Sequence, residues 1–212
     1  LLLEKLTRVY LSLPPADASR VGVAMRLADL HAEKARRLSM RELNEGCVKC
    51  LAGASDRKKA LQYYRDVQAK APVESAGKIA IQIGHLHELL GQNQEAKAAY
   101  AGILSAKVNP VSIAEAQLSL AEMAFKQGDF AEAQKYYQMV FDNSASLMGA
   151  RSLAAYRLAW CSFNRGHLEQ AILGLENVVK DKDRWVRSAV DRTSNSGQID
   201  LQLHEEVSRA YS

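Results

Sequence analysis

Two apolar stripes in the stretch from residue 112 to residue 140 constrain the fold more than any other feature of the chain. Each stripe repeats every three or four residues, which is the spacing of an amphipathic α-helix. Gly128 and Asp129 separate the two stripes, and a glycine followed by an aspartate is typical of one helix ending and another beginning. The stretch therefore predicts two antiparallel helices joined by a short turn. The stripes consist of Ile113, Ala116, Leu120, Ala121, Ala124 and Phe125, and of Phe130, Ala133, Tyr137 and Val140.

The same pattern recurs along the chain at a nearly constant period. A glycine is followed five residues later by alanine, and four residues after that by an aromatic or large apolar residue. A further copy, at Ala60 and Tyr64, has Ser55 in place of the glycine. The alanines step by 36, 37 and 38 residues. A period of this length predicts a solenoid, because one hairpin cannot bury both of its faces alone. The three full copies are Gly91–Ala96–Tyr100, Gly128–Ala133–Tyr137 and Gly166–Ala171–Leu175.

These residues resemble the tetratricopeptide repeat family over roughly residues 20–180. The resemblance implies an all-α, right-handed solenoid of antiparallel helical hairpins, whose first helices line a concave groove for a partner. The chain departs from the family in its longer period and in the lack of a tryptophan early in the first helices. The residues that carry the resemblance are Leu120, Ala121, Gly128, Phe130, Ala133 and Tyr137 in one repeat, Leu158, Ala159, Gly166, Leu168, Ala171 and Leu175 in the next, and Ile83, Gly84, Gly91, Ala96 and Tyr100 in the preceding one.

We expect one solenoid over residues 1–212. Its hairpins are predicted at about 19–71, 74–106, 111–142 and 150–180, with partial repeats or caps at 1–13 and 199–211. Asp17 or Ser19 is expected to cap the first long helix, and the helix from Asp56 to Lys70 is expected to start at Ser55 or Asp56. The first hairpin contains an insertion of about residues 37–54, which is either a local elaboration or a docking feature.

Composition and net charge limit the classes of function that the chain can have. The chain has 212 residues, of which 48% are hydrophobic and 25% charged, with a net charge of +4. The charge is too small to suggest a nucleic-acid partner, and the apolar runs are far shorter than the roughly 20 residues of a membrane span. Because the chain starts at Leu1 within an apolar pattern, we expect it to be part of a longer protein.

Motifs for catalysis, cofactors or metals are not apparent in the sequence. Cys47 and Cys50 lack the second ligand pair of a zinc site, which leaves two free thiols or a local disulfide if the protein is exported. Cys161 is expected to be buried. His85 and His87 lie two positions apart on a helix and are poor co-ligands, so His85 should face the groove and His87 should pack between helices. We therefore expect no enzyme activity, no cofactor and no metal.

The inner faces of the first helices are the candidate binding surface. Glu115 and Glu122 would repel the C-terminal carboxylate that some members of the family bind. Aromatic residues near Arg157 resemble a binding hot spot, or else pack on Trp185 and the last helix. The candidate partner-binding residues are Lys78, Ile81, His85, Glu88, Glu115, Leu118, Glu122, Phe125, Tyr156, Arg157, Trp160 and Phe163.

The sequence thus predicts a non-catalytic scaffold that binds a protein or peptide partner. In style it is similar to envelope-associated tetratricopeptide proteins of Gram-negative bacteria, including assembly and motility factors. This favours a bacterial protein in the periplasm or cell envelope, with the cytoplasm as the alternative. The alternatives in function are a structural or self-associating spacer whose groove is filled from within, and an RNA-binding helical repeat.

Overall fold

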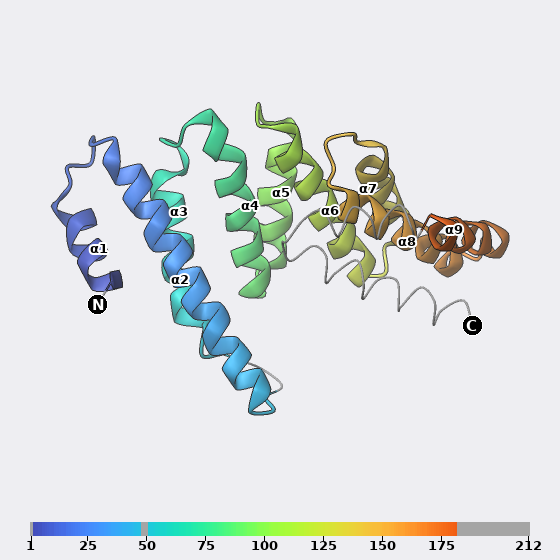
Figure 1. Cartoon of the computed structure of the whole chain (residues 1–212), viewed down its shortest axis with the longest axis horizontal. Helices are drawn as coiled ribbons and strands as arrows, with labels where there is room; N and C mark the ends of the chain where they lie inside the picture. Colours follow the sequence, from blue (N-terminus) through green and yellow to red (C-terminus); the bar gives the residue numbers. More distant parts are fainter. Residues whose placement is uncertain (1, 48–50, 182–212) are drawn as a thin grey trace. The chain divides into compact units, whose positions relative to one another are not determined.

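A computed structural model describes residues 2–47 and 51–181 of the chain, and α-helices account for all of its regular structure there. The helices are α1 (Leu2–Ser12), α2 (Ser19–Asn44), α3 (Ala54–Gln68), α4 (Val73–Leu89), α5 (Asn93–Ser105), α6 (Pro110–Lys126), α7 (Phe130–Asp142), α8 (Met148–Asn164) and α9 (Leu168–Lys180) (Figure 1). The all-α class and the paired helices are confirmed. The expected helix at 199–211 and Trp185 lie outside the described residues.

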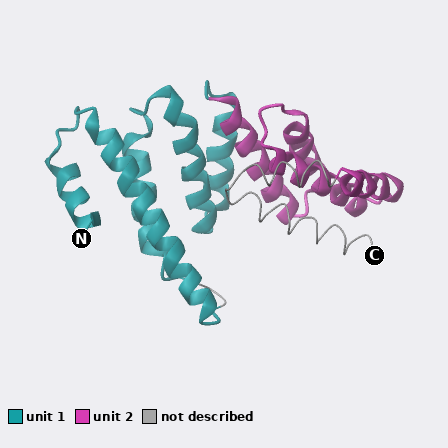
Figure 2. Cartoon of the chain, viewed as in Figure 1, with its two compact units in different colours: residues 1–108 teal, residues 109–212 magenta. Residues whose placement is uncertain are grey.

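The chain divides into two compact units, residues 1–108 and 109–212 (Figure 2). In the first unit each helix packs against the next, from α1 through α5. In the second unit α6, α7, α8 and α9 pack in the same sequential way, and α6 also contacts α8. Contact between two successive first helices is the stacking that a repeat architecture requires. The expectation that one solenoid spans residues 1–212 stays a prediction.

The turns inside the hairpins form as the glycines predict. Gly91, Gly128 and Gly166 have φ angles of 73°, 78° and 82°, a left-handed conformation that costs glycine little. The side chain of Asp129 then accepts a hydrogen bond of 3.0 Å from the backbone N–H of Glu132 and starts α7. Asn109 does the same for Ser112 at the start of α6, where Pro110 occupies the first turn.

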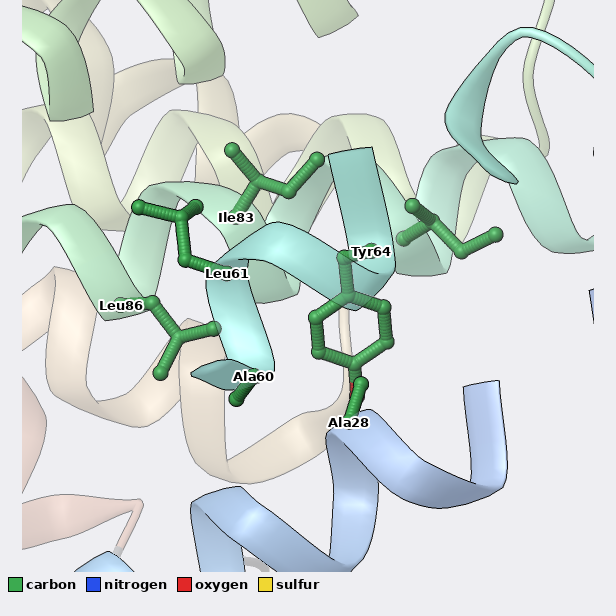
Figure 3. Packing of buried hydrophobic residues seen from close by; sticks show 7 residues of the cluster. Ala28, Ala60, Leu61, Tyr64, Ile83 and Leu86 are labelled. Atoms are coloured by element: carbon green, nitrogen blue, oxygen red, sulfur yellow. The ribbon is translucent and has the colours of Figure 1, made fainter. Parts of the chain in front are cut away.

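Small alanines of the second helices are buried between helices. Ala60, Ala96 and Ala133 are fully buried and Ala171 is 2% exposed, which confirms the predicted register. Around Ala60 the core joins α2, α3 and α4 (Figure 3). That core contains Ala28, Ala60, Leu61, Tyr64, Ile79, Ile83 and Leu86. Around Ala133 an equivalent core joins α6, α7 and α8, and it includes Cys161, which is buried as predicted.

The start of α3 differs from the prediction. The helix begins at Ala54, and neither Ser55 nor Asp56 caps it. Gly53 lies against α2 so closely that a Cβ there would come within 2.6 Å of the Ala35 carbonyl oxygen. Asp56, in the first turn of α3, is buried and accepts hydrogen bonds from His31 Nδ1 at 2.7 Å and from Lys34 Nζ at 3.2 Å. Asp56, a predicted cap residue, therefore binds side chains of α2 instead of capping α3.

The start of α2 also differs from the prediction, because Ala18 occupies the N-cap position and no side-chain hydrogen bond caps the helix. Asp17 instead bonds locally to Ser19. Its carboxylate accepts hydrogen bonds from the backbone N–H of Ser19 at 2.8 Å and from the Ser19 hydroxyl at 2.5 Å. These hydrogen bonds lower the pKa of the Asp17 carboxyl. The chain therefore enters the long helix through a turn held by a local side-chain contact.

Candidate functional site

In the second unit the structure brings together predicted residues from two successive first helices. Glu122 of α6 accepts a hydrogen bond from Arg157 Nε of α8 at 3.1 Å and another from the Tyr137 hydroxyl of α7 at 2.6 Å. Burial by itself would lower the pKa of the Arg157 guanidinium, but the charge and hydrogen bond of Glu122 together with the nearby Tyr137 and Tyr156 raise it overall. Arg157 therefore stays charged, and Glu122 is neutralised rather than left to repel a ligand.

An aromatic row continues along α8 from this ion pair. The ring centroids of Tyr156 and Trp160 are 6.2 Å apart, and those of Trp160 and Phe163 are 5.5 Å apart, both in edge-to-face geometry. Arg157 lies over the Phe125 ring, with Cζ 4.9 Å from its centroid. Tyr156 is buried, Trp160 is partly buried and Phe163 is 51% exposed. Accessibility thus increases toward the C-terminal end of α8.

Helix α9 covers part of this row. Leu175, Val178 and Val179 belong to the same apolar cluster as Tyr156 and Trp160. Tyr156 and Trp160 therefore pack in part against α9. The contact expected with Trp185 lies outside the described residues.

The remaining predicted residues of the second unit lie apart from this cluster. Glu115 is exposed near the start of α6, and Leu118 is partly buried against the core around Ala133. Neither shares a recorded hydrogen bond with Glu122 or Arg157 within the described residues. The accessible part of the candidate site in this unit is consequently formed by Arg157, Trp160 and Phe163.

In the first unit the predicted residues of α4 have separate roles. Lys78 is exposed, whereas Ile81 is 1% exposed and belongs to the core. Glu88 accepts a hydrogen bond of 2.8 Å from the Tyr100 hydroxyl, and the His85 ring contacts Tyr100 edge-on with centroids 5.7 Å apart. Burying an inner-face isoleucine removes it from any binding surface.

One polar contact that was not predicted recurs in three hairpins. The tyrosine of each second helix donates its hydroxyl to a carboxylate of the first helix: Tyr64 to Asp29, Tyr100 to Glu88 and Tyr137 to Glu122. Burial, and then the carboxylate, raise the pKa of the Tyr64 and Tyr137 hydroxyls. In the last hairpin Leu175 takes the tyrosine position, and Trp160 packs beside it. The sequence contained a signal for this contact, because all three tyrosines follow the repeat alanine by four residues.

A cavity of about 530 Å³ lies between α2, α3 and α4. His85, one of the candidate binding residues, lines it, but most of its lining was not anticipated. The unexpected residues come mainly from α2, with Arg57 and Tyr64 from α3 and Leu86 from α4. The full lining is Asp29, Ala32, Glu33, Arg36, Ser39, Met40, Leu43, Arg57, Tyr64, Gln82, His85, Leu86 and Leu89. A second, smaller cavity of about 270 Å³ lies between α7, α8 and α9.

The histidine and cysteine side chains discussed above form no metal site within the described residues. His87 is buried between Arg65, whose guanidinium nitrogen lies 3.0 Å from Nε2, and Gln92, whose Oε1 lies 2.7 Å from Nδ1; it packs between helices, as predicted. Among the described residues no three metal-ligating side chains gather at one place. Cys47 is disulfide-bonded, and Cys50 lies outside the described residues. The described helices include none that is long and apolar enough to cross a membrane.

Comparison with known families agrees with this geometry. A tetratricopeptide repeat family model matches residues 115–144, which span most of α6, the turn at Gly128 and all of α7. No curated protein matches the chain. The matched hairpin contains Gly128 and Ala133, and a turn glycine and a buried alanine recur at the equivalent positions of the α4–α5 and α8–α9 hairpins. The match supports assignment of the α6–α7 hairpin to the tetratricopeptide repeat family.

Proposed function

We propose that this chain is a non-catalytic scaffold that binds a segment of a partner protein, and that the second unit binds through Arg157, Trp160 and Phe163. Tetratricopeptide repeats generally mediate protein–protein interaction, which supports the class of function. The observation that carries the site is the accessible pair of aromatic rings next to an arginine that Glu122 holds in place. Tryptophan and arginine are enriched among residues that dominate binding energies.

The surroundings of Arg157 favour a polar or acidic group on the partner. Glu122 engages the Nε atom of Arg157, and 28% of the Arg157 side chain is exposed. A guanidinium has five N–H donors, so several remain for a carbonyl or carboxylate of a bound segment. The neighbouring rings of Trp160 and Phe163 would cover the apolar part of that segment.

The setting of this function is part of the proposal. By its resemblance in style to envelope-associated repeat proteins, we place the scaffold in a bacterial envelope or motility assembly. Two other functions remain as predictions. Packing of α9 on Trp160 supports a spacer whose groove is filled from within, and an RNA-binding repeat would show a salt-dependent gel shift.

Two variants in the second unit test the proposal. Partners are captured from the native host with the full chain, identified, and titrated as purified proteins against wild type, Trp160→Ala and Phe163→Ser. Leu168→Ser is the matched control, because Leu168 is 55% exposed but lies on α9, outside the candidate site. We expect each site variant to weaken binding about tenfold or more, which corresponds to one hot-spot residue. Retention of every partner at wild-type affinity by both site variants would refute the site, and failure to capture any protein would favour the spacer.

A further inference from the structure

The first unit has a groove because α2, the first helix of the α2–α3 hairpin, is unusually long. Helix α2 has 26 residues and α4 has 17. At 1.5 Å per residue, α2 is therefore about 13 Å longer than α4. Its C-terminal half extends past the neighbouring hairpin (Figure 1), and the cavity of about 530 Å³ lies between α2, α3 and α4. This volume is within the range of known ligand pockets, about 300–1,000 Å³.

Large apolar side chains are accessible at this groove. Met40 and Leu43 on α2 are 50% and 55% exposed, and Leu89 at the end of α4 is 59% exposed. Single exposed apolar residues are ordinary on protein surfaces, but three around one concave site form a surface that gains from being covered. Apolar side chains of a bound segment would supply that cover.

Two carboxylates line the groove, Asp29 and Glu33; both lie on α2 and both are already bound. Two guanidinium groups donate to Glu33, Arg36 Nε at 2.9 Å and Arg37 Nε at 2.7 Å. Hydrogen bonds from Arg36 and then from Arg37 lower the pKa of Glu33 to about 2. Asp29, also on α2, accepts the hydroxyl hydrogen bond of Tyr64 of α3. Neither carboxylate is therefore available to a third arginine.

Arg57 is that third arginine. It is partly buried in the lining of the groove, and its guanidinium donates to the neutral hydroxyl of Ser39 at 2.6 Å. No ion pair involving Arg57 occurs within residues 2–47 and 51–181. A partly buried guanidinium gains most from a carboxylate, which it can bind with two parallel hydrogen bonds. The groove thus combines apolar contact area with one fixed cationic group.

We propose that this groove binds a segment of a partner protein in which a carboxylate lies beside bulky apolar side chains. The carboxylate pairs with Arg57, and the apolar side chains cover Met40, Leu43 and Leu89. The site is separate from Arg157, Trp160 and Phe163 of the second unit. Variants of either site therefore test one proposal without altering the residues of the other.

The test uses labelled synthetic peptides of twelve residues and the full chain. One panel contains leucine or phenylalanine at several spacings from a glutamate, and its twin panel has glutamine in place of glutamate. Binding is measured by fluorescence anisotropy for wild type, Arg57→Gln, Met40→Ser and Arg26→Gln. Arg26→Gln is the matched control, because Arg26 is exposed on α2, the helix that carries Met40, and does not line the groove. Circular dichroism confirms that each variant is folded.

We expect at least one glutamate peptide to bind wild type about tenfold more tightly than its glutamine twin. Arg57→Gln should remove that preference, Met40→Ser should weaken both twins, and Arg26→Gln should change neither. Equal affinity for the twins, absence of binding by every peptide, or a preference that survives in Arg57→Gln would overturn the proposal. A concentration-dependent dimer that Met40→Ser abolishes would assign the groove to a second copy of the chain and would also overturn it.

Discussion

Substitution of Gly84 by alanine should destabilise the first unit, although alanine is the better helix former. Gly84 lies within α4 and is packed directly against α5. A Cβ atom built on Gly84 would lie 2.3 Å from Cε1 and 2.7 Å from Cζ of Tyr100. Ordinary contact begins at 3.4 Å, so the ring would have to move by about 1 Å. Tyr100 is fully buried and its hydroxyl is bound to Glu88, which leaves the ring no room to move freely.

The magnitude follows from two opposing terms. Alanine in place of glycine in a helix interior stabilises by about 1 kcal/mol. Overpacking a well-filled core typically costs about 1–3 kcal/mol, and the upper value applies here because a rigid buried ring is the obstacle. The free energy of unfolding should therefore fall by about 2 kcal/mol. For a chain of this size that corresponds to a decrease of about 4–8 °C in the melting temperature.

The measurement is urea and thermal unfolding followed by circular dichroism. Gly102→Ala is the matched control, because Gly102 lies in α5 of the same hairpin and a Cβ there would meet no atom within 4 Å. The control should be unchanged or up to about 1 kcal/mol more stable. In a Tyr100→Leu background the cost of Gly84→Ala should shrink, because the obstructing ring is gone. If Gly84→Ala were as stable as Gly102→Ala, the close approach of α4 and α5 would be refuted.

Two further predictions concern buried titratable groups. Burial alone would raise the pKa of Asp56, but hydrogen bonds from His31 and Lys34 lower it overall. The ion pair therefore stabilises the fold above the unfolded pKa of about 3.9. This stabilisation is lost as the pH falls through the lower pKa of the folded state. Asp56→Asn should therefore cost about 3 kcal/mol at pH 7 and should reduce the loss of stability seen below pH 4; equal urea midpoints for variant and wild type at pH 7 would contradict this. Burial also raises the pKa of the Cys161 thiol to about 11, so iodoacetamide at pH 8 should modify Cys161 in urea but not in the native chain, as peptide mass spectrometry would show. Rapid native modification of Cys161 would mean that the core around Ala133 opens readily.

The helical hairpins could be predicted because their signals are local. A glycine that permits a positive φ angle, followed by an alanine stripe at helical spacing, determines where each turn and each close approach falls. The buried alanines at 96, 133 and 171 are in this class. The grouping of Arg157, Trp160 and Phe163 was also predictable, because residues three or four apart on one helix share a face.

Long-range partners could not be predicted in the same way. Asp56 looks like a helix cap in the sequence, and only the packing of α3 on α2 turns it toward His31 and Lys34. Glu122 looks like an exposed repulsive charge, and the stacking of α8 on α6 neutralises it with Arg157. Such contacts depend on the register between hairpins, to which many residues contribute a little and no single motif reports.

The sequence by itself therefore determined the repeat, its period and the positions of its turns, because each follows from the conformational preference of residues close together in the chain. Tertiary structure decided which charges are paired, which inner-face residues are buried, as Ile81 is, and where a groove opens beside α2. The physical reason is that burial and charge pairing are properties of surfaces that meet. Those surfaces come from helices that are distant in sequence.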